Sequence, residues 1–181
     1  VMLADPRASQ IDLVVMREST EGLFYSAAAH DRPGVANDDE VQDILRITRR
    51  TSEKLFDFAF KLAEKRKARG KKGMVTCVDK ANVFRSLAFF REVFFDVAKG
   101  FPDIATDAVY VDAMSLYMVQ NTWDFDVLVM ENQFGDILSD ECAMITGSMG
   151  LLPSASLNAE GFGMYEPAGG SAPDIAGKGI A

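Results

Sequence analysis

Four short apolar stretches, each followed at once by polar or charged residues, constrain the fold of this chain more than any other feature. They cover residues 11–16, 74–78, 108–111 and 127–130 and are rich in Val, Leu, Ile and Met. Such continuous apolar runs are typical of strands that are covered on both faces, as in a mostly parallel sheet. We therefore expect these stretches to form one buried sheet.

Two longer segments between the strands show helical periodicity. In residues 43–68, positions three or four apart are apolar or Thr and predict one buried stripe, formed by Ile44, Ile47, Thr51, Leu55, Phe58 and Leu62. In residues 83–99 the same spacing joins Phe84, Leu87, Phe90, Phe94 and Val97. Strands that alternate with helices predict an α/β fold with a mixed or parallel sheet and flanking helices.

The second of these helices is apolar on more than one face, because Phe89 and Phe95 lie off the main stripe. A helix of this kind is buried on more than one side. Either it makes a helix-mediated contact with another subunit, or it is wedged between the sheet and a neighbouring helix. The pattern leaves both interpretations open.

Two segments lack strand or helix periodicity. Residues 27–39 are polar and contain Pro33 and Gly34, which predicts a loop or an extended arm. From Asn158 onward the chain is rich in glycine, with six of its 14 glycines in the last 24 residues. We expect this tail to be loop rather than core, and the chain to stop inside a fold.

The charge balance excludes some classes of protein. The 181 residues include 19 Lys and Arg against 27 Asp and Glu, for a net charge of −8. Bulk affinity for nucleic acid needs the opposite balance, because it depends on neutralising phosphates. No apolar run approaches the roughly 20 residues of a membrane helix, and the start of the chain has no secretory signal pattern.

One local excess of positive charge lies between residues 61 and 72. It could be the solvated last turn of a helix, where the helix dipole favours cations, or a site for a polyanion. The basic residues are Lys61, Lys65, Arg66, Lys67, Arg69, Lys71 and Lys72.

The two cysteines, Cys77 and Cys142, lie among apolar residues and have no CxxC or Cys/His spacing. We interpret both as buried free thiols in a reducing compartment, which predicts a cytoplasmic protein.

The polar residues after the strands mark the expected place of a binding site. They are Arg17 and Glu18, Asp79 and Lys80, Asp112, and Glu131 and Asn132, each pair or single residue following its own strand. In open α/β sheets, ligands bind outside the carboxyl ends of the strands. Four strands that end in this way predict a functional edge.

Three aspartates are candidate metal ligands. If a helix begins near Gly135, Asp136 and Asp140 are four residues apart and share one face. Like charges at that spacing repel each other, and a hard divalent cation such as Mg²⁺ or Mn²⁺ would relieve the repulsion. Alternatively, Asp136 favours a helix N-terminus and Asp140 faces solvent. Asp112 is either a third ligand or the N-cap of a helix over residues 113–120.

Five segments stand out when they are taken in order: VMRESTEG (15–22), VDKANV (78–83), YVDA (110–113), NQFGDILSD (132–140) and EPAGGSAPDIAGK (166–178). Together they resemble the metal-dependent β-decarboxylating 2-hydroxyacid dehydrogenases, and in particular the branch of 3-isopropylmalate and tartrate dehydrogenases. The resemblance covers nearly the whole chain. It implies an isopropylmalate/isocitrate dehydrogenase-like fold with a dimer-forming helical face.

The resemblance also implies roles for individual residues. Arg17 would bind a substrate carboxylate, and Asn82 would lie near both substrate and nicotinamide. Two residues would be catalytic, Lys80 and Asp112, and Lys80 would take the hydroxyl proton. Both would reach the active site of the neighbouring subunit, so that a homodimer would be the functional unit. The implied ligands of Mg²⁺ or Mn²⁺ are Asp112, Asp136 and Asp140. The NAD-binding residues would be Asn82, Gly169, Gly170, Ser171, Ala172 and Asp174.

Two positions depart from the family pattern. A tyrosine that helps to protonate the enolate usually stands seven residues after the arginine, where this chain has Phe24, followed by Tyr25. On an extended segment, an offset of one residue reverses the direction of a side chain. Gly169 stands where many members carry a histidine that meets the adenine. The one histidine of this chain, His30, is expected at the surface.

Two functions are compatible with these patterns. One is NAD-dependent oxidation, with decarboxylation, of a 2-hydroxy dicarboxylic acid that resembles 3-isopropylmalate or tartrate. The other is a non-catalytic subunit or dimerisation module with the same fold. Because the family is roughly twice as long, the resemblance implies a fragment that lacks its N- and C-terminal parts. Residues 1–147 would then form a substrate, metal and dimerisation domain, and residues 148–181 part of the dinucleotide-binding domain.

Overall fold

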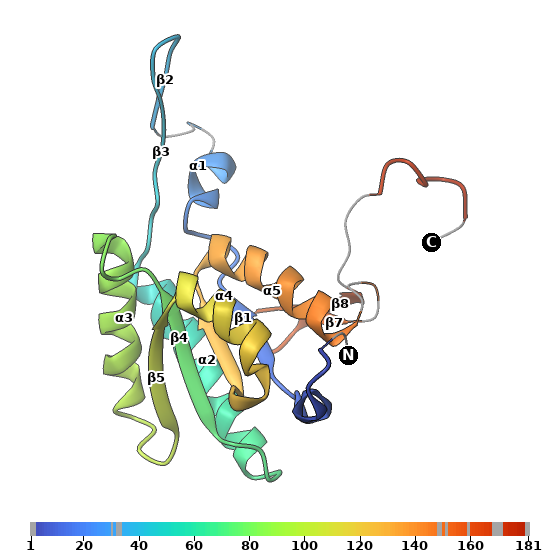
Figure 1. Cartoon of the computed structure of the whole chain (residues 1–181). Helices are drawn as coiled ribbons and strands as arrows, with labels where there is room; N and C mark the ends of the chain where they lie inside the picture. The colour runs from blue at the N-terminus through green and yellow to red at the C-terminus, as the bar shows by residue number, and fades with distance from the viewer. Residues whose placement is uncertain are drawn as a thin grey trace.

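A four-stranded parallel sheet forms the centre of the computed structural model (Figure 1), which describes residues 3–29, 31, 34–147, 150, 152–158, 160–167 and 172–179. The sheet has the order β1-β6-β4-β5, and each pair of neighbours is parallel. The strands are β1 (Val14–Arg17), β4 (Met74–Asp79), β5 (Ala105–Tyr110) and β6 (Val127–Met130). The four predicted strands are confirmed, with shifted ends for β1, β4 and β5.

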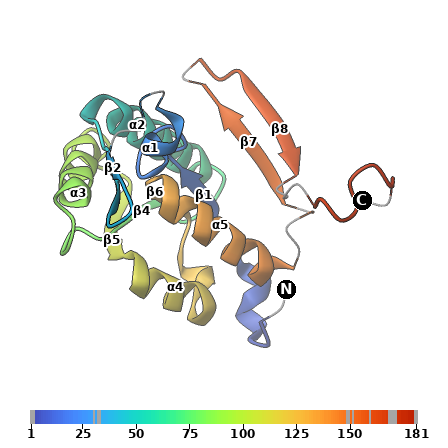
Figure 2. The ribbon, with the colours of Figure 1, turned by 90° about the horizontal axis from the view of Figure 1, so that it is seen from above.

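Helices cover both faces of this sheet, which Figure 2 shows from above. One layer consists of α2 (Arg49–Lys67) and α3 (Arg85–Ala98), and the other of α4 (Val111–Gln120) and α5 (Asn132–Thr146). Successive side chains of β6 point to opposite layers, since Val127 and Val129 pack against the first and Leu128 and Met130 against the second. The α/β class is therefore confirmed, with a parallel sheet.

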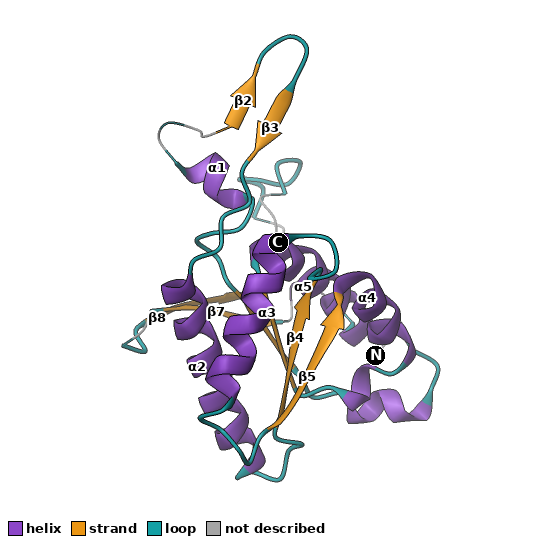
Figure 3. Cartoon of the chain, turned by 90° about the vertical axis from the view of Figure 1, so that its left-hand side faces the viewer, coloured by secondary structure: helices purple, strands orange, loops and turns teal. Residues whose placement is uncertain are grey.

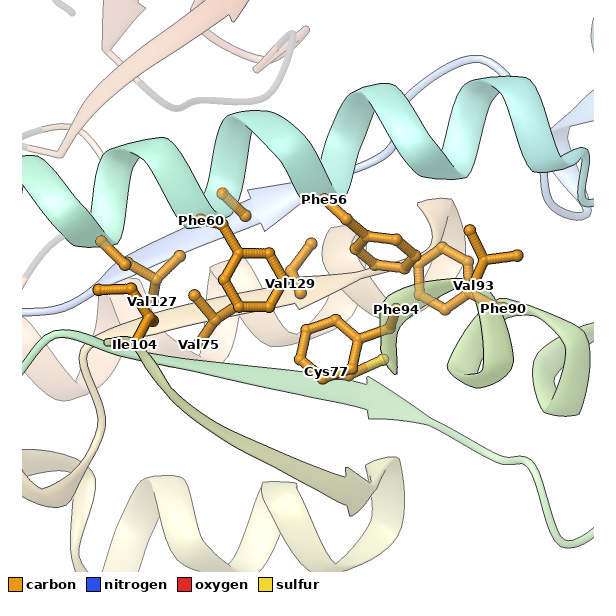
Figure 4. Close-up of a cluster of buried hydrophobic side chains, with 12 residues drawn as sticks. Phe56, Phe60, Val75, Cys77, Phe90, Val93, Phe94, Ile104, Val127 and Val129 are labelled. Carbon is orange, nitrogen blue, oxygen red and sulfur yellow. The ribbon is translucent and has the colours of Figure 1, made fainter. Parts of the chain in front are cut away.

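The first layer is built on phenylalanines (Figure 4). Phe56 and Phe60 of α2 meet Phe90 and Phe94 of α3, with ring centroids 4.6 Å apart for Phe56 and Phe90 and 5.3 Å apart for Phe60 and Phe94. All four rings are buried. These tilted and offset ring pairs fix the two helices against each other and against the sheet.

The predicted stripe of α2 is wrong by about one residue. The fully buried positions are Ser52, Phe56, Ala59, Phe60 and Ala63, whereas Leu55 and Leu62 are half-buried beside them. The cause is the start of the helix. The backbone N–H of Thr51 donates to the Thr48 side chain, so α2 begins at Arg49, and Ile44, counted as its first apolar position, lies before it and is exposed.

Most apolar side chains of α3 are wedged between the sheet and α2. Leu87, Phe90, Val93 and Phe94 are buried in this way. Phe84, predicted as part of the stripe, precedes the helix as its N-cap residue and is exposed, as is Phe95. The wedge accounts for the main stripe without a second subunit.

The predicted arm carries a short hairpin that projects from the body of the molecule (Figure 3). It follows α1 (Phe24–Ala28) and pairs β2 (Gly34–Ala36) with β3 (Val41–Asp43) in antiparallel register. Both strands are exposed. The arm is attached next to the carboxyl end of β1, where the backbone of Gly22 bridges to Arg46.

The glycine-rich tail is not entirely loop, which corrects the sequence-based prediction. Residues Gly163–Pro167 form β8, which pairs antiparallel with β7 (Pro153–Leu157). The prediction failed because local composition carries no information about a pairing partner, here residues 153–157. The hairpin is largely exposed. Two 3₁₀ turns complete the described elements, Pro6–Gln10 and Thr122–Asp124.

The basic segment at residues 61–72 ties elements of the fold together. Arg66 donates through Nε to buried Asp126, at 2.5 Å, and through Nη2 to Asp12, at 2.9 Å. Lys71 pairs with Asp12, and Lys72 donates to the carbonyl of Phe125 at 3.3 Å. These contacts join the end of α2 to the starts of β1 and β6. They favour the helix-end interpretation over a polyanion site.

Both cysteines are buried free thiols, as predicted. Burial raises the pKa of Cys142 to about 11 and that of Cys77 well above its usual value. In the described parts of the chain, no helix has the length and apolarity that a membrane span requires.

Candidate active site

Arg17, the last residue of β1, is held by the start of α5. Its Nε and Nη2 atoms donate to the Asn132 side-chain oxygen at 2.9 and 2.7 Å, and its Nη1 pairs with Asp136 one turn further along. Asn132 is buried, and its own amide nitrogen donates to the Glu21 carbonyl at 3.0 Å. Two of the three guanidinium nitrogens are thus fixed by a buried amide, and the third faces an exposed carboxylate.

Gly135 makes this arrangement possible. A Cβ atom at position 135 would lie 2.5 Å from the Cγ and 2.6 Å from the Cβ of Arg17. No real Cβ tolerates such contacts, so the first turn of α5 approaches Arg17 only because residue 135 is glycine. The role of Gly135 was not predicted from the sequence.

The helix that carries Asp136 starts at Asn132, three residues before the predicted start. Glu131, the residue after β6, is its N-cap and accepts hydrogen bonds from the backbone of Phe134 at 2.8 Å and of Gln133 at 3.1 Å. Because Glu131 is buried, its pKa is raised above the usual value, and these two bonds offset part of that effect. The sequence contained a signal for this N-cap, because Glu131 is an acidic residue between a predicted strand and a predicted helix.

The two aromatic residues after Arg17 point to different cations. The ring centroid of Phe24 lies 5.3 Å from the Arg17 guanidinium carbon, and that of Tyr25 lies 4.6 Å from the guanidinium carbon of Arg46. The Tyr25 ring therefore lies beside Arg46, and the Phe24 ring beside Arg17 carries no hydroxyl group.

Lys80 and Asp112 form a second charged group on the other side of the sheet edge. Lys80 Nζ lies 2.6 Å from Asp112 Oδ1. The Lys80 ammonium donates a hydrogen bond to the Asp112 carboxylate, and this bond holds the pKa of Asp112 below its usual value. The N-cap of α4 is Tyr110, so the N-cap alternative for Asp112 is wrong. Asp112 lies in the first turn, where the helix dipole favours a negative charge.

The three aspartates do not come together within one chain. Asp136 pairs with Arg17, Asp112 pairs with Lys80, and Asp140 is exposed one turn after Asp136 on α5. Among the described residues, no group of three or more His, Cys, Asp or Glu side chains could hold a metal ion.

The remaining predicted residues lie on turns. Asn82 is exposed in the turn between β4 and α3. Ala172, with φ of 38°, and Asp174 are exposed in the last described segment. Gly169, Gly170 and Ser171, as well as His30, lie outside the described residues. The NAD-binding role of this segment stays a prediction.

Comparison with known proteins connects this geometry to a family. The model of the family described as isocitrate/isopropylmalate dehydrogenase matches residues 2–181. The chain belongs to this family. The resemblance inferred from the five segments is thereby confirmed.

Relatives in the family extend well beyond this chain. A 3-isopropylmalate dehydrogenase of Pseudoalteromonas translucida is 49% identical over 98% of this chain and 48% of its own length. One of Salmonella typhimurium is 47% identical over 98% of this chain and 47% of its own length. The chain thus spans about half the length of the curated relatives it matches.

Two solved structures share the fold of this chain. The crystal structure of an isocitrate dehydrogenase from Methylococcus capsulatus has a TM-score of 0.80 at 41% identity, over 94% of this chain and 49% of that one. The TT0538 protein from Thermus thermophilus gives a TM-score of 0.82 at 33% identity, over 97% of this chain and 34% of that one.

Proposed function

We propose that this chain is the substrate-binding and metal-binding part of an NAD-dependent dehydrogenase that oxidises, with decarboxylation, a 2-hydroxy dicarboxylic acid resembling 3-isopropylmalate or tartrate. The observation that carries the proposal is the Arg17 fork, held by buried Asn132 at the carboxyl edge of the sheet, next to Asp136 and Asp140. It is supported by the names of the relatives, which are 3-isopropylmalate dehydrogenases.

Arg17 is the proposed binder of a substrate carboxylate. A guanidinium presents paired N–H donors whose geometry matches a carboxylate. Asn132 accepts one N–H group each from Nε and Nη2, which leaves the end-on pair of N–H groups on Nη1 and Nη2 for a carboxylate, with Asp136 displaced from Nη1. Fixing the side chain before the substrate arrives lowers the entropy cost of the interaction.

Asp136 and Asp140 suit a divalent metal in their chemistry, because both offer hard oxygen ligands on an exposed helix face. The family resemblance implies Asp112 as a third ligand, and we propose that Asp112 of a second copy supplies it. Such an ion, Mg²⁺ or Mn²⁺, supplies Lewis acidity toward the hydroxyl and carboxylate oxygens of the substrate.

Lys80 is the proposed general base. In its neutral form, Nζ could take the hydroxyl proton of the substrate. Asn82 would help to hold the nicotinamide of NAD, which would supply the hydride acceptor. Phe24 has no hydroxyl group, so it cannot protonate the enolate that follows loss of CO₂.

A homodimer with shared sites fits the exposed apolar surface of the second helical layer. Leu116 and Val119 of α4 and Ile137 and Met144 of α5 are between 51% and 61% exposed. Apolar side chains gathered on adjacent helices are typical of an interaction surface. Asp112 lies in the first turn of α4, and Asp136 lies one turn after the start of α5. A second copy at this surface would therefore lie close to both aspartates.

Two further proposals follow from the family and the composition. Residues 1–147 would form the substrate, metal and dimerisation domain, and residues 148–181 would lead into the dinucleotide-binding domain. The buried free thiols at Cys77 and Cys142 support a reducing compartment such as the cytoplasm.

The direct test is an assay of the full-length protein with Mn²⁺ or Mg²⁺ and NAD against a panel of 2-hydroxy dicarboxylic acids. We expect reduction of NAD and release of CO₂ with at least one acid that carries an apolar or hydroxyl substituent. Failure to reduce the cofactor with every acid of the panel would contradict the proposal.

The second candidate function, a non-catalytic module, is favoured by one observation, the Phe24 ring beside Arg17. Calorimetric titration of Mn²⁺ into the full-length protein and its Asp136→Asn variant separates the candidates. An enzyme should lose most of its Mn²⁺ affinity in the variant, whereas a structural module should show no site-specific loss.

A further inference from the structure

The residue before Lys80 is a buried carboxylate in a tight ion pair. Asp79, the last residue of β4, is fully buried, and Arg91 of α3 donates to both of its oxygens, from Nε at 2.6 Å and from Nη2 at 2.8 Å. The arginine is itself partly exposed. A two-point contact of this kind fixes the orientation of both planar groups.

The same carboxylate also holds the turn that carries Lys80. Asp79 Oδ1 accepts the backbone N–H of Ala81 at 2.8 Å. On the other side, the carbonyl of Lys80 accepts the N–H groups of Val83 and Phe84 at 3.0 and 3.1 Å. The backbone of Lys80 is therefore fixed from both directions, and only its side chain is left to be ordered.

Tyr110 provides a surface for that side chain. It lies opposite Asp79 in the register of β4 and β5. Its ring centroid is 4.8 Å from the Arg91 guanidinium carbon and 5.8 Å from Lys80 Nζ. Both distances allow an attraction between cation and ring.

The ion pair with Asp112 cannot order the lysine by itself. The Lys80 side chain is 23% exposed, but that of Asp112 is 67% exposed, and solvent screening on the Asp112 side weakens the hold of the pair on the lysine. A lysine has four rotatable bonds to fix, and a stacked arginine keeps the Tyr110 ring in place beside it.

We propose that Asp79, Arg91 and Tyr110 form a positioning set that holds Lys80 in its reactive geometry, an inference that rests on the proposed role of Lys80 as general base. Asp79 fixes the backbone of the turn, and Arg91 holds both the Asp79 carboxylate and the Tyr110 ring in place. The Tyr110 ring in turn limits where the Lys80 ammonium group can lie. A buried ion pair is weak evidence for a stabilising role, and its place directly before Lys80 favours positioning.

The test compares two variants at position 110 in the full-length protein, assayed for kcat and KM with the acid on which the wild type is active. Tyr110→Leu removes the ring, and Tyr110→Phe keeps it. We expect Tyr110→Leu to lower kcat about tenfold or more with little change in KM, because a small displacement of a reacting group is costly. Tyr110→Phe should restore kcat to within about threefold of the wild type.

A second comparison uses arginines. Arg91→Lys keeps the charge and loses the two-point contact, so it should also lower kcat at similar KM. The matched control is Arg49→Lys. Arg49 of α2 likewise lies over an aromatic ring, that of Phe89, and it pairs at the surface with Asp96 of α3, so its replacement should leave kcat unchanged.

The outcomes separate this inference from the proposed function. Thermal unfolding of each variant shows whether the fold is retained. If Lys80→Met abolishes turnover while Tyr110→Leu and Arg91→Lys both keep the wild-type kcat, the positioning set is wrong and the role of Lys80 stands. If Lys80→Met keeps the wild-type kcat, both are wrong. A fall in kcat that Tyr110→Phe does not rescue also contradicts the proposal.

Discussion

The two halves of the carboxyl edge of the sheet hold their charged side chains in different ways. In the β1–β6 half, the Arg17 side chain is 32% exposed and is fixed through buried Asn132. In the β4–β5 half, the Lys80 side chain is 23% exposed and pairs with Asp112, whose side chain is 67% exposed. Both cations therefore face an exposed carboxylate, Asp136 or Asp112, but Arg17 is also fixed by a buried neutral amide.

This difference bears on how the proposed site would be completed. A guanidinium that is already fixed suits the binding of a rigid carboxylate, since its geometry is set in advance. Asp112, in the first turn of α4, pairs with Lys80 but stays open to solvent. Under the proposed function, one half from each of two copies would make up each site.

The largest expected effect in the β1–β6 half comes from Arg17→Lys. Lysine has one ammonium group, so it cannot donate to Asn132 and also make a two-point contact with a carboxylate. We expect kcat/KM of the full-length protein to fall, mostly through a higher KM, by an amount that corresponds to about 2–4 kcal/mol of lost transition-state stabilisation. Steady-state kinetics checks this, with Arg46→Lys as the control, since Arg46 contacts Tyr25 instead. An unchanged KM would remove Arg17 from the substrate site.

A smaller effect is expected from Gly135→Ala. The added Cβ would lie 2.5 Å from Arg17 Cγ, so the arginine or the helix must move. Such overpacking costs about 1–3 kcal/mol of stability and should also raise KM. Denaturant unfolding measures the first effect and kinetics the second. The matched control is Gly100→Ala, whose nearest contact, the Val97 carbonyl oxygen, is at 3.4 Å. Equal stability of the two variants would contradict the close approach.

The smallest effect is expected from Phe24→Tyr, which compares the rings beside the two cations. Phe24 lies beside Arg17, and Tyr110, with a phenol, lies beside Lys80. A hydroxyl group at position 24 would add a proton donor, which should raise kcat for decarboxylation by about tenfold. Tyr25→Phe should have no effect, because that ring lies at Arg46. A rise with Tyr25→Phe, or none with Phe24→Tyr, would place the proton donor elsewhere.

The central sheet was predictable from the sequence because each of its strands contains a short, largely apolar run. The start of α2 was not, because Ile44 and Ile47 continue the helical spacing in front of the cap at Thr48. β8 was missed because its partner lies in another segment and its glycine-rich surroundings resemble a loop.

The site was predictable to the extent that strand ends and motifs locate it. Arg17, Lys80, Asp112 and Asp136 all lie along the predicted edge. The residues that were missed contact residues that are far away in the sequence. The approach of Gly135 to Arg17 joins positions more than a hundred residues apart, and spacing along the chain cannot reveal it.

The central claim is that each site takes one half from each of two copies, and mixing two inactive variants tests it directly. Full-length Lys80→Met and Asp136→Asn are each expected to be inactive, since one lacks the β4–β5 half and the other the β1–β6 half. When the two are co-expressed, about half of the dimers are mixed, and each mixed dimer has one intact site, so about a quarter of wild-type activity should return. Activity no higher than that of either parent would show that Lys80 and Asp136 serve the same site within one chain, and would contradict the account.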